Sequence, residues 1–143
     1  GYPGMKILQF AFDSREESDY LLHNYTHNCV VYTGTHDNDT VMGWYDTLKG
    51  ADKKLCDDYL RLKNADGEPI PREQLPWEFV RAAMSSVADL AIIPMQDYLG
   101  LGSEARINIP STLGINWKWR MGNGDFTKEL AGRIRSMTKL YGR

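Results

Sequence analysis

Few features of this sequence set it apart from an ordinary globular protein. Its 143 residues include only two cysteines, Cys29 and Cys56, and neither lies in a redox motif. We therefore expect free thiols and a reducing, cytoplasmic location. No secretory leader is recognisable, and no apolar run approaches the ~20 residues that a membrane-spanning helix needs. With 17 basic and 19 acidic residues the net charge is −2, so bulk charge does not draw the chain to nucleic acids or anionic membranes.

What the sequence does contain is enough apolar material for a core. Hydrophobic residues make up 42% of the chain and aromatic residues 11%, which suits one folded unit of this length. No internal repeat or low-complexity tract appears, so residues 1–143 are expected to form a single segment. Apolar runs predict strands, and helical spacing or capping residues predict helices between them. The expected strands cover residues 5–12, 29–34 and 91–96. The expected helices cover residues 40–50, 51–63, 76–89 and 126–141, and residues 14–20 are expected to form a short helix or a helical turn.

The predicted strands and helices alternate along the chain. Such alternation is typical of α/β proteins in which helices cover a parallel sheet. Three strands make a poor closed architecture, so we expect either a small open sheet or part of a larger barrel. A strand-like run follows Gly1 within a few residues, and this abrupt start favours the partial barrel. Residues 98–125 are rich in glycine, asparagine and proline, and loops of that length are usually functional.

The stretch 30–40 is the strongest candidate for a site. A β-branched and aromatic run delivers His36 and Asp37 at the carboxyl end of a predicted strand, where α/β proteins place their chemistry. Asp13 and Asp97 follow the other two predicted strands. If the strands are parallel, the three carboxylates meet at one rim. The alternative is that each carboxylate only caps the turn or helix that follows it.

Two further patterns suggest cofactors but fit them poorly. His23, His27 and Cys29 could form a zinc cluster, yet their spacing matches no common zinc motif, so we expect no metal site. Residues 100–105 loosely match a dinucleotide fingerprint. The next residues, 106–110, cannot begin the helix that such a site requires.

Two tryptophans lie close together in the long loop. Trp117 and Trp119 flank Lys118, and flat rings beside polar Asn108 and Asn116 would suit the faces of sugars. Nucleic-acid bases would stack on similar groups. The alternative is that the tryptophans anchor the loop to the rest of the fold.

Several blocks of sequence carry a resemblance to a known family. They are Pro3–Asp13, His23–Tyr25, Tyr32–Thr40, Gly43–Tyr45, Gln96–Gly102, Arg106–Pro110 and Asn116–Arg120. These blocks resemble the carboxyl-terminal part of the 4-α-glucanotransferases, also called amylomaltases or disproportionating enzymes, which form glycoside hydrolase family 77. They occur in the family's order and extend over nearly the whole chain.

The resemblance implies an α/β fold that is a partial (β/α)8 TIM barrel, with this chain supplying strands six to eight. Enzymes of the family cut an α-1,4 bond in a maltooligosaccharide, hold the donor glucan covalently on an aspartate and pass it to another glucan. This is a retaining double displacement, which uses two carboxyl groups about 5 Å apart. The resemblance implies no organic cofactor. The partner that it implies is a maltooligosaccharide or another α-glucan.

The resemblance also assigns roles to individual residues. It implies that Asp37 is the carboxylate that stabilises the transition state and that His36 contacts the same sugar. Asn108 matches a substrate-binding asparagine in the loop after strand eight. Phe12 and Asp13 fall where the family places sugar contacts after strand six.

The family's nucleophilic aspartate and acid/base glutamate belong to strands four and five, which would precede Gly1. We therefore expect the isolated chain to be inactive, and its open barrel edges to favour self-association. Two alternatives stay open. One is a non-catalytic carbohydrate-binding unit that uses Trp117, Trp119 and Asn108, and the other is a hydrolase of the α-amylase clan.

Overall fold

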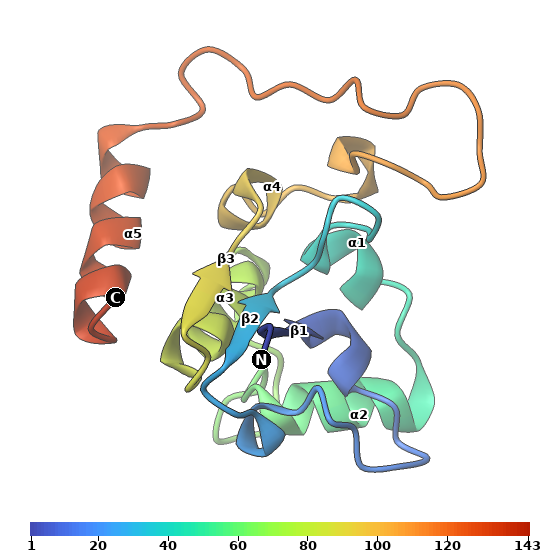
Figure 1. Cartoon of the computed structure of the whole chain (residues 1–143), viewed down its shortest axis with the longest axis vertical. Coiled ribbons are helices and arrows are strands. Elements are labelled where there is room, and N and C mark those ends of the chain that lie inside the picture. The colour runs from blue at the N-terminus through green and yellow to red at the C-terminus, as the bar shows by residue number, and fades with distance from the viewer.

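The computed structural model describes residues 1–143 and is organised around a small sheet (Figure 1). Its strands are β1 (Gly4–Ile7), β2 (Cys29–Tyr32) and β3 (Leu90–Ile92). They lie in the order β1-β2-β3, and both pairings are parallel. The predicted parallel α/β arrangement of three strands is therefore confirmed.

One face of the sheet is covered by a helix. Val31 of β2 pairs with Lys6 on one side and with Ala91 on the other, so these three residues form one row across the sheet. Val31 is fully buried and belongs to the same apolar cluster as Ala83 of α3 (Leu75–Ser85). The helix thus supplies the hydrophobic cover that a parallel strand needs.

The opposite face of the sheet is open. Met5, Val30 and Leu90 form one row across it. Met5 is 55% exposed, Leu90 51% and Ile92 42%. Successive residues of a strand point to opposite faces, so Leu90 and Ile92 lie on the same face as Met5. Together these exposed side chains form an apolar patch.

The remaining helices lie around the sheet and towards one end of it (Figure 1). The largest core cluster contains Phe79 of α3, which is fully buried and meets the rings of Trp44 and Tyr45 edge-on. None of the helices has the length and apolar character needed to cross a membrane. The α-helices other than α3 are α1 (Val41–Tyr45), α2 (Gly50–Tyr59), α4 (Met95–Tyr98) and α5 (Lys128–Leu140), and the 3-10 helices are Leu8–Ala11, Leu22–Asn24, Arg72–Gln74 and Ser103–Ala105.

Helix α5 is joined to the rest of the fold by a long segment that extends over one end of the molecule before it returns (Figure 1). The helix packs on α3 through Met137, which shares a cluster with Trp77. The guanidinium of Arg133 lies 3.9 Å from the centre of the Trp77 ring, a cation–π contact. Ile134 and Leu130 face the same cluster as predicted, whereas Leu140 is 69% exposed and does not.

All three predicted strands end earlier in the structure than the sequence suggested, the central one by only two residues. The first ends at Ile7, because Leu8–Ala11 turns into a 3-10 helix that carries Leu8 and Ala11 into the main core. The third ends at Ile92, because Pro94 caps α4 and its carbonyl oxygen accepts from the Asp97 and Tyr98 N–H groups. Uniformly apolar runs do not distinguish a buried strand from a buried helical turn.

Residues 14–20, for which the sequence predicted a short helix or a helical turn, form turns and no helix. Glu17 should close a capping box with Ser14, but its carboxylate instead binds the side chains of His23 and Asn24. The Ser14 N–H donates to Asp52 at 2.8 Å. These longer-range partners hold the segment as turns.

Candidate active site

The loop after β2 places its polar side chains through a set of local hydrogen bonds. Asn38 Oδ1 accepts from both the backbone N–H and the hydroxyl of Thr35, at 2.8 and 2.9 Å. Thr40 caps α1 by accepting from the Gly43 N–H. Gly34 is required because a Cβ there would lie 2.5 Å from Nε2 of Gln9. The turn therefore has one compact shape between the strand and the helix.

His36, Asp37 and Asn108 come together at this end of the sheet. Asn108 Nδ2 donates to Asp37 Oδ1 at 2.7 Å, and His36 Nε2 lies 3.4 Å from the same oxygen. About half of each of the His36 and Asp37 side chains is exposed, at 55% and 49%. The structure thus joins three of the five residues expected in the site, and it leaves their polar atoms open to a ligand.

Backbone contacts fix the two segments that carry these side chains. The Asn108 N–H donates to the His36 carbonyl oxygen at 3.1 Å. The Arg106 guanidinium donates to the carbonyl oxygens of Asp37 and Asn108, at 2.8 and 2.9 Å. Arg106 lies in one of the blocks that resemble the family, but the sequence did not predict its contact with Asp37, from which 69 residues separate it.

One of the two tryptophans considered for sugar stacking lies beside His36. The rings of Trp117 and His36 have their centres 5.0 Å apart and are inclined by 39°. Trp117 is 55% exposed, and its backbone N–H donates to the Ile107 carbonyl oxygen at 2.7 Å. It therefore anchors the loop at its backbone while one part of its ring stays accessible.

Asp97 does not reach the rim where the sequence placed it. Its side chain is almost fully buried, with 1% exposure, and it accepts from the Thr33 hydroxyl at 2.6 Å and the Val41 N–H at 2.9 Å. Burial raises the pKa of Asp97 to about 6, in spite of these two hydrogen bonds, and the negative charge of Asp39 acts in the same direction. The predicted rim of three carboxylates is therefore wrong for Asp97.

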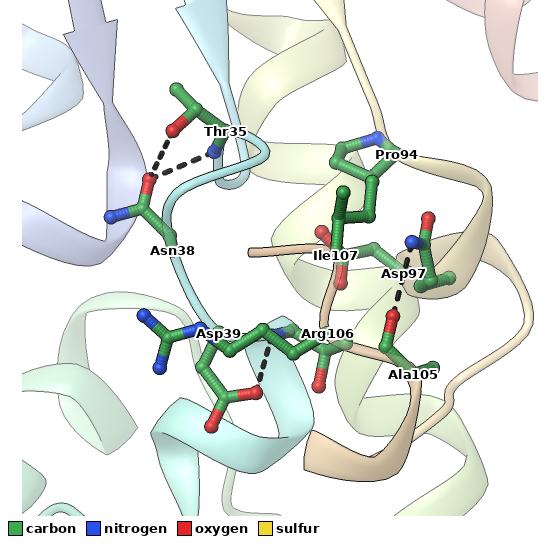
Figure 2. A pocket seen from close by; sticks show the side chains of 10 residues that line it. Thr35, Asn38, Asp39, Pro94, Asp97, Ala105, Arg106 and Ile107 are labelled. Atoms are coloured by element: carbon green, nitrogen blue, oxygen red, sulfur yellow. Dashed lines mark hydrogen bonds between the residues drawn. The ribbon is translucent and has the colours of Figure 1, made fainter. Parts of the chain in front are cut away.

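Beside Asp97 lies a cavity of about 10 Å³, which is close to the size of one water molecule (Figure 2). Its walls include Asp39, Gln96 and Arg106 as well as Asp97. Gln96 donates to the Ala105 carbonyl oxygen at 3.2 Å. Polar groups from three segments of the chain thus meet behind the His36–Asp37 turn.

Phe12 and Asp13 lie in other surroundings. Phe12 is buried in the main core, 5.9 Å from the ring centres of both Trp44 and Tyr59. Asp13 accepts from both the backbone and the guanidinium of Arg15, and this hydrogen bonding lowers the pKa of Asp13 to about 2. Neither residue makes a hydrogen bond or ring contact with the Asp37 group.

The residues considered for zinc also have other partners. His23 binds the Tyr59 hydroxyl and Glu17, and the Cys29 thiol donates to the Thr26 carbonyl oxygen. Cys29 and Cys56 are both buried and free. No group of three histidine, cysteine or acidic side chains is arranged to hold a metal ion.

An open cavity of about 420 Å³ lies between the uncovered face of the sheet and the candidate site. Its walls include Met5, Tyr32 and Ile92 of the strands, and His36 and Ile107 at the strand ends. Of the candidate site residues, His36 lines this cavity, and Asp37, Asn108 and Trp117 lie against His36. A carboxylate, an amide, an imidazole and an indole grouped in this way suit a ligand with many hydroxyl groups and apolar ring faces. Asp37 can stabilise positive charge that develops on that ligand.

The sequence of this chain matches a known protein family. The sequence profile described as 4-alpha-glucanotransferase matches residues 1–125. The chain is 49% identical to a 4-alpha-glucanotransferase of Clostridium butyricum and 47% identical to one of Thermus thermophilus, and it covers 28% of each. These alignments include 100% and 97% of the chain.

A solved structure gives the same relationship. An amylomaltase from Streptococcus agalactiae in complex with acarbose superposes with a TM-score of 0.89 at 35% identity, over 99% of this chain and 28% of that one. The chain thus spans about a quarter of the length of the proteins it matches.

Proposed function

Because this chain belongs to the 4-alpha-glucanotransferase family, glycoside hydrolase family 77, we propose that it is the part of such an enzyme that binds and stabilises the sugar at the bond being broken. The observation that carries this proposal is the contact of Asn108 with Asp37 beside His36, at the carboxyl ends of parallel strands. In barrels of this kind the active site lies at that end. We assign the three strands to positions six to eight of the family's barrel.

In the proposed reaction, an α-1,4-glucan is cleaved by retaining double displacement and its donor part is passed to a second glucan. The sugar gains positive charge as the bond breaks. Asp37 would stabilise that charge, while Asn108 orients its carboxylate by donating to Oδ1. His36 would contact the same sugar. We place the nucleophilic aspartate and the acid/base glutamate in the part of the enzyme that this chain does not cover.

The proposed substrate is a maltooligosaccharide or a longer α-glucan. The related Streptococcus agalactiae amylomaltase was solved with acarbose bound, which supports a ligand of this class. We propose a cytoplasmic location, which is consistent with the two free thiols. Phe12 and Asp13 remain proposed sugar contacts, although Phe12 would first have to leave the core in which it packs.

The test uses a graft enzyme, in which residues 1–143 of this chain replace the matching stretch of the Clostridium butyricum 4-alpha-glucanotransferase. The graft should redistribute chain lengths from maltotriose, and Asp37→Asn should reduce kcat at least ~100-fold, since one electrostatic contact to a transition state contributes on that scale. The matched control is Asp58→Asn on α2, whose carboxylate pairs only with Lys54 at the surface. That variant should keep full activity.

The isolated 143-residue chain should release no glucose from maltotriose, because the proposed nucleophilic aspartate and acid/base glutamate belong to the part of the enzyme that this chain does not cover. Turnover by the isolated chain would refute this assignment of roles. A graft that binds maltooligosaccharides but performs no chemistry would favour a non-catalytic binding unit. A graft that yields only reducing sugar at high acceptor concentration would favour a hydrolase.

A further inference from the structure

We propose that Asp97 is a positioning residue for Asp37, and that its buried carboxylate holds both ends of the loop on which Asp37 lies. The inference rests on the proposed function, because it concerns the same site. Asp97 touches neither the open cavity nor Asp37 itself. Its effect on the reaction must therefore pass through the loop.

The geometry of the two hydrogen bonds supports this role. Oδ2 accepts from the hydroxyl of Thr33, the first residue after β2, and Oδ1 accepts from the N–H of Val41, the first residue of α1. The loop between them, residues 34–40, contains His36 and Asp37. One rigid carboxylate thus fixes the distance between the strand end and the helix start.

Other groups hold the loop between these two ends. Gln9 donates to the Asp39 carbonyl oxygen at 2.8 Å, and the Ser103 hydroxyl donates to the Asp39 carboxylate at 2.6 Å. Both contacts lie after Asp37 in the chain. Between its ends, the loop is closed by Asn38 on Thr35, and its backbone at Asp37 accepts from Arg106. Asp97 is the group that joins the strand end at Thr33 to the helix start at Val41. Its loss should therefore let the loop that carries Asp37 shift while the fold remains intact.

The negative charge of Asp97 is costly for a purely structural role. An asparagine could accept from Val41 and donate to Thr33 without burying a charge. Hydrogen bonds to a carboxylate are shorter and stronger than those to a neutral amide, so the charge gives a firmer loop. Around Asp97 the Thr33 hydroxyl and Val41 N–H favour its ionised form, whereas Asp39 opposes it, and Arg106 lines the same small cavity.

The experiment introduces Asp97→Asn into the graft enzyme. We expect kcat above pH 7 to fall about tenfold or more with KM changed less than about twofold, because misplacement of Asp37 weakens a contact made in the transition state. The ratio of native to variant kcat should shrink below pH 6, where native Asp97 is itself neutral. The melting temperature should stay equal or rise.

Two further variants complete the test. Thr33→Val removes one partner of Asp97, so it should lower kcat in the same way, and the double variant should be little worse than either single one. Asp57→Asn is the matched control, because Asp57 is equally buried but binds Tyr45 and Lys53 on the far side of α1. It should lower stability and leave kcat unchanged.

The outcomes separate the two proposals. An active graft in which Asp97→Asn keeps native kcat overturns the positioning role and leaves the proposed function standing. An active graft in which Asp97→Asn and Asp57→Asn lose kcat equally also overturns it, since the loss is then one of general stability. A native graft without activity overturns the proposed function, and this inference with it.

Discussion

Asp97 is ionised at neutral pH only at a cost in stability. Its carboxylate is 1% exposed, and burial raises its pKa from 3.8 to about 6. The folded protein therefore binds a proton between about pH 4 and pH 6 that the unfolded chain has already released. The stability contributed by this group is present at low pH and is lost as pH rises through that range. The shift corresponds to roughly 3 kcal/mol.

Asp97→Asn removes this pH dependence. Between pH 4.5 and 7.5, the free energy of unfolding of the variant minus that of the native chain should rise by about 2 kcal/mol. Urea unfolding of both proteins across this range measures the difference. A difference that does not change with pH would show that Asp97 is not protonated in the folded state at pH 5.

At the level of residues, the polar side chains directly after β2 pointed to the candidate site. His36 and Asp37 could be predicted because a strand end and two polar side chains lie next to each other in the chain. The roles of Arg106 and Asp97 could not be predicted, since their contacts depend on the three-dimensional approach of segments 69 and 64 residues apart. Asp97 also differs from Asp13 and Asp37 by its burial, which an acidic residue after an apolar run does not reveal.

Helix α1 is tightly enclosed at Gly43. A Cβ at this position would overlap the Ser103 hydroxyl and lie 2.6 Å from the nearer oxygen of the Asp39 carboxylate. The Ser103 hydroxyl also donates a hydrogen bond of 2.6 Å to the Asp39 carboxylate. A side chain here must push apart a contact that joins α1's loop to the 3-10 helix at Ser103–Ala105.

Gly43→Ala should therefore lower the free energy of unfolding by about 1–3 kcal/mol, as overpacking of a filled site does. The matched control is Gly132→Ala in α5, where a Cβ meets nothing within 4 Å. That variant should gain about 0.5–1 kcal/mol, because alanine favours a helix more than glycine does. Chemical denaturation of the two variants compares them directly. Equal effects would mean that helix propensity, not packing, decides both.

Among the elements, the sequence predicted the longer helices and β2 best. Val80, Ala83 and Met84 recur at helical spacing and are buried along one side of α3. The ends of β1 and β3 were wrong because Leu8 and Pro94 can continue an apolar strand or begin a helical turn, and the choice depends on what they pack against. The local sequence pattern therefore predicts whether a long element is a helix or a strand better than it predicts where that element ends.

At the scale of the whole molecule, the sheet has one uncovered face and two unpaired edges. Met5, Leu90 and Ile92 lie together on that face and are about half exposed. Apolar patches and free strand edges favour pairing with another chain. In the proposed complete barrel, this face would be turned inward and covered by the remaining strands.

The isolated chain should therefore self-associate in a concentration-dependent manner, and the double variant Leu90→Lys and Ile92→Lys should associate less. Leu113→Lys is the control, because Leu113 is fully exposed at 101% but lies on the long loop and not on the sheet. Sedimentation velocity at several concentrations measures the species present. A native chain that remains monomeric at high concentration would contradict the proposed partial barrel.

The loop that ends at Trp117 bears on how the sequence around the candidate site can change in evolution. Its base is closed by the bond from the Trp117 backbone N–H to the Ile107 carbonyl oxygen and by Asn116 Oδ1, which accepts from the Ile109 N–H. Its tip, residues 110–115, is exposed. Within the tip, the carbonyl and hydroxyl oxygens of Thr112 accept from the side chain of Asn116, which belongs to the same loop. Changes of sequence in the tip can therefore alter what approaches the proposed sugar site without displacing the Asp37 group.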